Sequence, residues 1–558
     1  MMTHRNLPGS GYLFRLCCLA LLTAIVPALP AMAQATVTVD LSHSINILTD
    51  TAIGFPAAMF SGDDFNPAGA PYLRTAGVTT PRYPGNHGVA DLYHWSTKTT
   101  TKYKGADAAY FAPDSNFANF AQVAEKLGNA LVVVNYGSNT DGNGGGEPAE
   151  AAAWVAYANG DPADTHPIVK DSTGDDWHTV GYWATLRSSA PLASDDGLNF
   201  LRISHPKPFG FKLWQIGDQI YNNGYLGGKY VGNADLHGPA PTALKDFAKL
   251  KKNPPLSPAA FGDNLKLFAA AMKAVDPSIQ IGIGLATPPA AGKGRPQPGS
   301  INEWNSGNND ETTGSEWNAA VLKSVCAAID FVSFDWETGG VLPPDYKTLD
   351  EDNLFPDTRF QIAGMIAAML DQYKATCPAG HVPRIALSLA QIKTWAKQDH
   401  PIVNALWIAD TYTTLVESGF LNIDGPDAIG DAMISADHKK FGPAFYGLQM
   451  LHIVAHNPGD ALLDAHSSSL QLSVHASRRR DGIFGLMLVN TDTKSPANVK
   501  VSLKGGSVGA TGKRFDYSAA QLSQSSGPVA SPFTVTGEDF TITVPPLTVT
   551  DVLLPLAK

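Results

Sequence analysis

The chain has 558 residues, a formal net charge of −11 and an ordinary hydrophobic content of 44%. Its acidic balance argues against nucleic acid and anionic lipid surfaces as partners, because both repel a negatively charged protein, and it favours a neutral ligand. A chain of this length is expected to form one large domain and a smaller one.

The first 33 residues have the pattern of an export signal. Arg5 and Arg15 flank a polar stretch, residues 16–29 are apolar, and Ala31-Met32-Ala33 forms a cleavage site of the A-x-A type. The apolar run is too short to span a bilayer as a stable helix, and no later segment is long and apolar enough to do so. We therefore expect a signal peptide over residues 1–33, a secreted or periplasmic mature protein, and no membrane insertion.

Removal of this signal leaves Cys326 and Cys377 as the cysteines of the mature chain. An oxidising compartment allows them to form a disulfide, and two buried thiols are the alternative. Neither cysteine has a Cys or His neighbour at zinc-ligand spacing, and the histidines form no His-Glu-x-x-His pattern. The sequence also lacks a phosphate-binding loop and a dinucleotide fingerprint, so we expect neither a metal nor a cofactor.

The central region alternates short apolar segments with stretches of helical periodicity, a pattern typical of parallel strands covered by helices. The strands are expected at Ile53–Phe60, Val78–Tyr83, Ala130–Tyr136, Phe211–Gly217, Ile279–Leu285, Phe331–Trp336, Arg384–Leu389 and Phe420–Ile423. Helices are expected between them, at Phe117–Leu127, Ala149–Ala158, Pro258–Val275, Trp317–Ala328, Phe360–Tyr373 and Val403–Val416. Eight such units predict an α/β fold, a (β/α)8 TIM barrel over residues 51–440.

Four polar insertions interrupt this region. They are Thr97–Ala108, Ala163–Gly197, Tyr225–Pro255 and Pro288–Glu316, the longer ones being rich in Gly, Pro, Asn and Asp. If each follows a strand, all four lie at the carboxyl end of the barrel and form its ligand-facing rim.

Short alternating strands with turn residues between them replace the helical pattern from about residue 460. This texture predicts a C-terminal β-sandwich over residues 441–558. The mature N-terminus also alternates at Thr36–Leu41, so residues 34–50 are expected to supply the first strand of the sandwich.

Three sequence runs resemble clan A glycoside hydrolases of the arabinofuranosidase type. The run Trp214-Gln215-Ile216-Gly217-Asp218-Gln219 is similar to the fourth-strand signature Trp-Glu-Ile-Gly-Asn-Glu of that family. Arg82-Tyr83-Pro84-Gly85-Asn86 resembles its second-strand loop, and Asn135-Tyr136-Gly137 its third strand. The resemblance runs over most of the mature chain, and it implies the same barrel and a glycan ligand.

According to this resemblance, an amide side chain stands at one catalytic position and an apolar side chain at the other. Gln219 stands where the family has its general acid/base, and an amide has no titratable proton near neutral pH. Leu389, in Ser388-Leu389-Ala390-Gln391, stands where the family has its nucleophile, and leucine cannot attack an anomeric carbon. Both carboxylates of the retaining mechanism are therefore expected to be missing.

Other carboxylates are gained near the same place. Asp218 replaces the Asn of the family signature, Asp335 and Glu337 replace a His and a Tyr on the sixth strand, and Asp424 ends the eighth strand. Neighbouring carboxylates raise one another's pKa and can form a new acid/base pair, which in an inverting enzyme stands about 6.5–9.5 Å apart. Alternatively these acids bind sugar hydroxyls, cap loops, or pair with Arg82.

Three functions follow as hypotheses. The first is glycan binding in the barrel cleft without hydrolysis. The second is hydrolysis by relocated carboxylates, drawn from Asp218, Asp335, Glu337 and Asp424. The third, a scaffold for a protein partner, has no residue to support it. The expected substrate-binding residues provide hydrogen bonds or aromatic faces for an oligo- or polysaccharide, with Trp336 and Tyr221 the best candidates for stacking. They are Arg82, Asn86, Tyr136, Gln219, Tyr221, Trp336 and Asp424.

Overall fold

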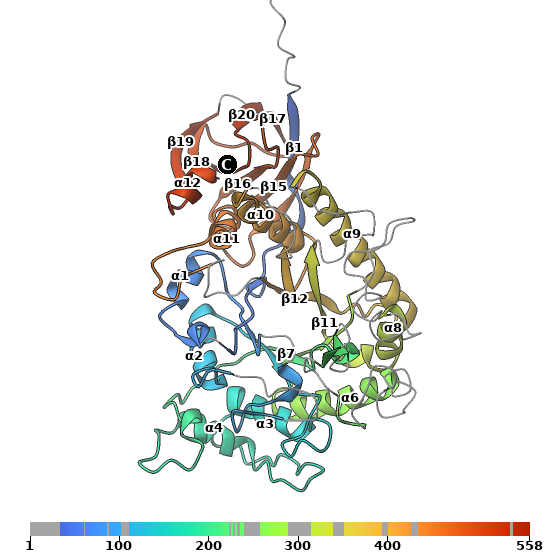
Figure 1. Ribbon diagram of the computed structural model, residues 1–558. Coiled ribbons are helices and arrows are strands. Elements are labelled where there is room, and N and C mark those ends of the chain that lie inside the picture. The colour runs from blue at the N-terminus through green and yellow to red at the C-terminus, as the bar shows by residue number, and fades with distance from the viewer. Residues whose placement is uncertain are drawn as a thin grey trace, which may run out of the picture.

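The computed structural model has two parts, a barrel and a large C-terminal sheet (Figure 1). It describes residues 34–60, 62–85, 89–101, 111–222, 225–226, 229–230, 235–238, 257–287, 314–338, 351–392, 400–425, 433–535 and 539–557. Side chains are not described at a few positions inside these ranges, among them Glu337 and Leu389.

The barrel is an eight-stranded parallel sheet in the order β2-β13-β12-β11-β10-β7-β6-β3. Its strands are β2 (Ile53–Gly54), β3 (Arg82–Tyr83), β6 (Leu131–Val134), β7 (Leu213–Ile216), β10 (Gln280–Gly284), β11 (Phe331–Thr338), β12 (Arg384–Ile392) and β13 (Ile423–Asp424). A parallel bridge from Pro56 to Arg82 joins the two ends of the sheet and nearly closes it. The eight predicted strands are thus confirmed, although β2, β3 and β13 are shorter than predicted.

Alternate strand residues face opposite sides of the barrel wall. Leu131, Val133 and Phe331 belong to a small cluster inside the barrel. Their neighbours Val132 and Val332 belong to the large core shared with the helices. Since both faces are buried, the strands have nearly continuous apolar sequences, which is the pattern that predicted them.

Helices are present at all six predicted places, and three further helices, Ala70–Thr75, Val180–Ser188 and Pro443–Val454, were not predicted. Together these helices are α1 (Ala70–Thr75), α2 (Phe117–Leu127), α3 (Pro148–Asn159), α4 (Val180–Ser188), α6 (Pro258–Val275), α8 (Gly314–Val325), α9 (Glu351–Thr376), α10 (Ile402–Glu417) and α11 (Pro443–Val454). Side-chain caps fix two of the starts: Asn116 accepts a hydrogen bond from the backbone of Asn119, and Ser257 accepts one from that of Ala260. These caps explain why α2 and α6 have the predicted bounds.

One insertion lies at the wrong end of the barrel for a rim loop. Ala163–Gly197 follows α3 rather than a strand, and it contains α4. A chain that leaves the carboxyl end of β6 and passes down α3 has returned to the amino end of the strands, so this part of the rim prediction is wrong. The other three insertions lie mostly outside the described residues. Thr97–Ala108 contains β5 (Thr99–Thr100), which pairs with β4 (Tyr93–His94). Tyr225–Pro255 contains two short strands that pair with each other, β8 (Tyr225–Leu226) and β9 (Lys229–Tyr230).

The C-terminal part is one nine-stranded sheet in the order β19-β18-β21-β16-β15-β14-β1-β17-β20. Its strands are β1 (Ala35–Ile47), β14 (Ala461–Ser467), β15 (Leu472–Arg478), β16 (Ile483–Asn490), β17 (Ala497–Lys504), β18 (Thr511–Ser518), β19 (Val529–Thr534), β20 (Asp539–Val544) and β21 (Thr548–Pro555), and α12 (Ala519–Ser523) follows β18. The strand β1 lies antiparallel to β14 and parallel to β17. This confirms that Thr36–Leu41 joins the C-terminal strands, whereas the two-layer sandwich stays a prediction.

Helices α10 and α11 lie between the barrel and this sheet (Figure 1). On the sheet, Met487, Val489 and Val549 belong to the same core as the barrel helices. A second core, which includes Val39, Leu486 and other alternate residues, lies on the opposite side of these strands. The sheet therefore shares a hydrophobic core with the barrel.

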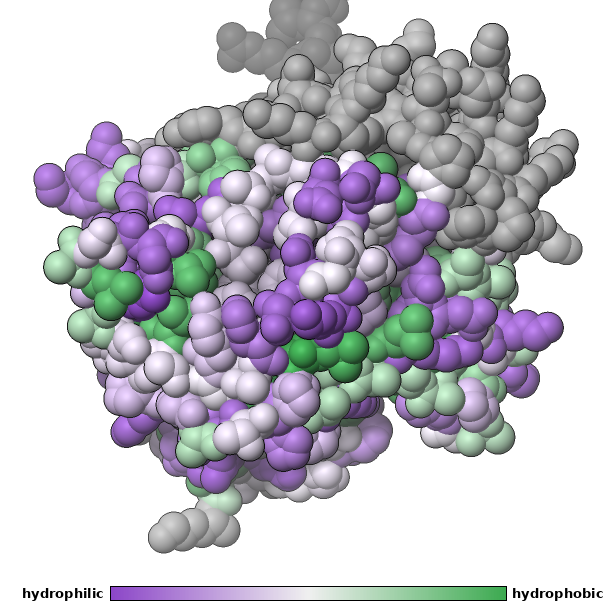
Figure 2. All heavy atoms as spheres, turned by 90° about the horizontal axis from the view of Figure 1, so that it is seen from below, coloured by the Kyte–Doolittle hydropathy of each residue, from purple (hydrophilic) through white to green (hydrophobic). Residues whose placement is uncertain are grey.

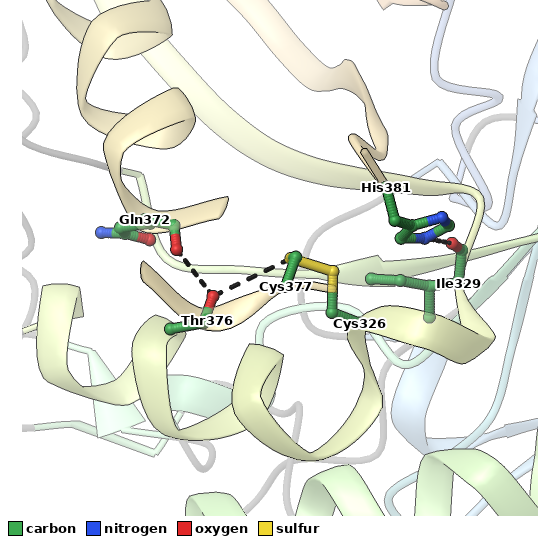
Figure 3. The surroundings of a disulfide bond; sticks show 6 residues. All are labelled: Cys326, Ile329, Gln372, Thr376, Cys377 and His381. Atoms are coloured by element: carbon green, nitrogen blue, oxygen red, sulfur yellow. Dashed lines mark hydrogen bonds between the residues drawn. A yellow bond between two sulfur atoms is a disulfide. The ribbon is translucent and has the colours of Figure 1, made fainter. Parts of the chain in front are cut away.

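A disulfide joins Cys326 to Cys377, and so decides between the two alternatives for these cysteines (Figure 3). Cys326 directly follows α8 and is the first residue of the 3-10 turn η6 (Cys326–Ala328), and Cys377 directly follows α9. Nearby, an imidazole nitrogen of His381 lies 2.9 Å from the carbonyl oxygen of Ile329.

Among the described residues, no helix is long and apolar enough to cross a membrane.

Candidate functional site

Polar side chains gather at the carboxyl ends of the barrel strands, where enzymes of this architecture bind their ligands. The strand-end residues are Arg82 on β3, Asp218 and Gln219 after β7, Asp335 on β11, Ser388 on β12 and Asp424 on β13. Asp335 has the same parity along β11 as Phe331, so it faces the inside of the barrel. We call this group the mouth cluster.

Arg82 and Asp218 form a buried ion pair. Their side chains are 0% and 2% exposed, and Nη2 of Arg82 lies 2.6 Å from Oδ1 of Asp218. Burial by itself lowers the pKa of Arg82, but the neighbouring acidic residues, Asp218 above all and then Asp424 and Asp335, outweigh it and raise that pKa. The guanidinium therefore stays charged, and the ion pair that the sequence offered as an alternative is confirmed.

Gln219 is tied to Asp335 across the mouth. Its side-chain amide donates a hydrogen bond to Oδ2 of Asp335, and the hydroxyl of Ser388 donates to Oδ1 at 2.5 Å. The backbone carbonyl of Asp335 accepts a hydrogen bond from the hydroxyl of Thr287, which follows β10. Side chains on or just after β7, β10 and β12 thus all bind to Asp335 on β11.

Asp424 is the least satisfied member of the mouth cluster. It is fully buried, and neither carboxyl oxygen accepts a hydrogen bond from any described residue. A Cβ atom at position 54 would clash with Oδ1 of Asp424, so the carboxyl occupies the space that Gly54 leaves open. Burial raises the pKa of Asp424 well above its usual value, Asp335 raises it further, and Arg82 opposes them, so the neutral acid is favoured.

Asp91, in the 3-10 turn η2 (Ala90–Leu92), was not found from the sequence. It is fully buried, and its two oxygens accept hydrogen bonds from the backbone N–H of Tyr136 at 3.1 Å and of Asp218 at 2.9 Å. Burial, and then the charge of Asp218, raise its pKa to about 7. Asp91 therefore holds together the two chain segments that follow β6 and β7. Sequence patterns pointed to strand ends, and a carboxylate that caps backbone groups from a neighbouring turn leaves no such pattern.

The aromatic residues do not form the predicted stacking surface. Trp336 is 1% exposed, its indole N–H donates to Gln361 on α9 at 3.0 Å, and its ring lies 5.9 Å from that of Trp407 on α10. Tyr136 is also fully buried, and its hydroxyl accepts a hydrogen bond from Asn264 on α6. Both rings pack between the strands and the helices, so the sugar-stacking role predicted for them is not supported. The reason is parity, because Trp336 follows the inward-facing Asp335 and so points outward.

Tyr221 remains close to the mouth cluster. Burial raises its pKa well above the usual value, and Asp335 and Asp218 raise it further. Of the other predicted residues, Asn86 and the side chains of Glu337 and Leu389 lie outside what the structure describes. The backbone of Leu389 is paired with Asp335 in the β11–β12 register, next to an irregularity at Phe334.

Metal-ligand groups and cavities are the other features that could mark a binding site. No group of three or more His, Cys, Asp or Glu among these residues could hold a metal ion. A cavity of about 620 Å³ lies instead at the amino ends of the strands, where it is lined by Ile53, Thr79, Asn129, His452 and their neighbours. Because the carboxylates are at the other end of the barrel, we do not assign the mouth chemistry to this cavity.

No protein-family model and no curated protein match the sequence. Solved structures do match. An α-L-arabinofuranosidase from Thermotoga maritima, complexed with arabinose, is 15% identical with a TM-score of 0.60, over 94% of this chain and 100% of that one. A family 51 α-L-arabinofuranosidase from Bifidobacterium longum is 13% identical with a TM-score of 0.61, over 93% and 99%. A family 44 xyloglucanase from Paenibacillus polymyxa is 13% identical with a TM-score of 0.55, over 94% and 100%. At these identities the likeness shows the fold, which is that of family 51 and family 44 glycoside hydrolases.

Proposed function

We propose that this is a secreted protein that binds an oligo- or polysaccharide at the barrel mouth without the standard retaining hydrolysis. The observation that carries the proposal is the hydrogen bond from the amide of Gln219 to Asp335. Retaining glycosidases need two carboxyl groups about 5–5.5 Å apart, one of which exchanges a proton with the glycosidic oxygen. Gln219 cannot exchange a proton, and as a donor to Asp335 it acts as a structural and ligand-facing amide.

Binding would use the polar groups of the mouth. The guanidinium of Arg82, the amide of Gln219 and the carboxylate of Asp335 provide donors and acceptors for sugar hydroxyls, and the ring of Tyr221, which is 5% exposed, supports them from beside the cluster. Asp91 would hold the β6 and β7 segments in register, so that these groups keep their spacing. Sugar-active proteins of the same fold act at this end of the barrel.

Two further parts of the proposal concern the rest of the chain. Export is supported by the signal pattern over residues 1–33 and by the Cys326–Cys377 disulfide, which persists in oxidising compartments. A two-layer sandwich is supported by the separate core around Val39 and Leu486, since two packed layers of alternating strands enclose a core between their inner faces.

The test is incubation of the pure mature protein with a panel of polysaccharides and aryl glycosides. Products are measured by mass spectrometry, and ligand binding by the shift in melting temperature. We expect no product and a thermal shift with at least one glycan, and the shift should be smaller in Tyr221→Ala. Release of a product by the wild-type protein, lost in Asp335→Asn, would overturn the proposal.

The second candidate is hydrolysis by relocated carboxylates, and the position of Asp424 favours it. A buried carboxylic acid with a raised pKa can donate a proton, while Asp335 accepts hydrogen bonds as a carboxylate would. This function predicts a bell-shaped dependence of rate on pH, and loss of activity in Asp424→Asn, Asp335→Asn or Glu337→Gln. Activity with a flat pH profile would contradict it.

A further inference from the structure

A second cavity lies far from the mouth, beside α4. It has a volume of about 520 Å³, and its lining includes Tyr182, Arg202, Asp164, Thr165 and Thr185. Because α4 follows α3 and precedes β7, this cavity lies towards the amino ends of the barrel strands. Figure 2 shows the molecule from below relative to Figure 1, which is the side where α4 lies, and there apolar residues form separate patches among polar ones.

The tyrosine of this cavity is held by other rings. The imidazole of His178 packs against Tyr182 in a tilted arrangement with ring centroids 4.0 Å apart, and Trp183 meets the tyrosine edge to face at 5.2 Å. Trp183 itself is buried, and its indole N–H donates to the carbonyl of Trp177 at 2.8 Å. A partly exposed tyrosine supported in this way loses little freedom when a ligand packs against it.

The polar side of the cavity is also fixed. Arg202 lines the cavity and donates two hydrogen bonds, at 2.6 and 2.7 Å, to Asp196, which is not one of the lining residues. Burial and then the charge of Asp196 raise the pKa of Tyr182, and Arg202 opposes them. The guanidinium is therefore neutralised by a carboxylate, which argues against an anion as the ligand. An aromatic ring beside paired planar groups and threonine hydroxyls instead suits the apolar face and the hydroxyl edge of a neutral sugar.

We propose that this cavity is a second glycan-binding site, which holds a neutral sugar of a polysaccharide through Tyr182 and the Arg202–Asp196 pair. The inference rests on the proposed function, since it assumes that the protein meets polysaccharides. Two sites on one molecule raise the apparent affinity for a long chain and leave that for a short oligosaccharide nearly unchanged. The site thus extends binding to the class of long, uncharged polysaccharides.

The experiment compares Tyr182→Ala and Tyr182→Phe with a matched control, Tyr72→Ala. Tyr72 on α1 is also a partly exposed tyrosine stacked on a histidine, His438, but it does not line this cavity. Retardation of each protein is measured in native gels containing soluble arabinan, xyloglucan or hydroxyethyl cellulose. Tyr182→Ala should weaken retardation by roughly 3- to 10-fold, Tyr182→Phe by less because the ring remains, and Tyr72→Ala not at all.

A mouth variant, Tyr221→Ala, separates the two proposals. Loss of retardation in Tyr182→Ala, greater for polysaccharide than for a short oligosaccharide, supports the second site, whatever Tyr221→Ala does. Loss in Tyr221→Ala alone leaves the proposed function standing and overturns the second site. If no polysaccharide of the panel retards the wild-type protein, both proposals are overturned. Circular dichroism of each variant confirms that it is folded.

Discussion

Gln219 shows how one side chain determines what the mouth cluster can do. Its amide donates to Asp335, whereas a glutamate at the same place would bring two carboxylates together. We expect Gln219→Glu to lower the free energy of unfolding by about 1.5–3 kcal/mol at pH 7.5, because a hydrogen bond to a charged group is replaced by repulsion. At pH 4.5 the cost should be smaller, since the new carboxyl can be protonated there.

Urea denaturation at the two pH values measures this effect. Gln122→Glu on α2 is a suitable control, because Gln122 is half-buried and donates to a backbone carbonyl rather than to an acid. An equal cost at pH 4.5 and 7.5, or a cost no larger than that of the control, would contradict the role assigned to Gln219.

Asp91 makes the free energy of unfolding depend on pH. Its pKa is about 7 in the folded protein against a usual 3.8, so the folded state binds this proton more tightly than the unfolded state. The stabilisation that comes from this tighter proton binding is complete below pH 3.8 and is lost as the pH rises through 7. Asparagine has one acceptor oxygen where Asp91 uses two, so Asp91→Asn should be less stable than the wild type near pH 4. Because asparagine does not ionise, the difference should move in favour of the variant by on the order of 4 kcal/mol between pH 4 and pH 8.

Unfolding curves in urea at pH 4, 5.5, 7 and 8 give this comparison. The informative quantity is the difference between the two proteins at each pH, because other groups titrate equally in both. A difference that stays constant from pH 4 to 8 would mean that the pKa of Asp91 is not raised.

At the scale of elements, the sheet and the barrel are joined by a buried charged cluster. His475 on β15 lies 3.0 Å from Asp410 and 3.0 Å from Glu417, both on α10. Burial alone would lower the pKa of His475, but Glu417 and Asp410 outweigh it and raise that pKa to about 10. The imidazolium therefore neutralises two carboxylates between two structural layers.

Removal of this histidine should weaken the contact between the layers. We expect His475→Gln to cost about 3–5 kcal/mol at pH 7, because Asp410 and Glu417 lose the buried imidazolium that pairs with both of them. The contribution of His475 is complete below pH 6.5 and disappears as the pH rises through 10, so the cost should shrink in alkali. Denaturant unfolding at pH 6, 8 and 10 measures it, with His466→Gln on β14, an exposed histidine also paired with an aspartate, as the control.

At the scale of the whole molecule, the disulfide closes a long loop. Cys326 and Cys377 are 51 residues apart, and a loop of this length implies a stabilisation of about 4 kcal/mol from the restricted unfolded chain. We expect Cys326→Ala to lower the free energy of unfolding by about 2–4 kcal/mol. Dithiothreitol should destabilise the wild type by a similar amount and should not destabilise Cys326→Ala further.

The sequence predicted the barrel well and the mouth in part. Buried parallel strands such as β6 and β7 are short apolar runs between amphipathic helices, so their number and order could be recognised. The strand-end motifs correctly brought Arg82, Asp218 and Gln219 to one place. The stacking role predicted for Trp336 was wrong because a position near the end of a strand does not determine whether the side chain faces the inside of the barrel or the surrounding helices. Asp91 could not be found at all, since its role depends on two backbone groups that only the folded chain brings to it.

The position of β1 bears on how the chain reaches its final form. This strand lies inside the nine-stranded sheet, and its bond from Thr36 to Ser468 spans 432 residues. At a synthesis rate of about 5–20 residues per second, the first strand made waits roughly 20–90 s for its partners. Both of its edges are open during that time, and an open strand edge is a template for aggregation. The barrel can fold as it emerges, but the C-terminal sheet can be completed only after the last strand is released. A truncation directly after α11 removes β14 and β17 and so leaves both edges of β1 permanently exposed.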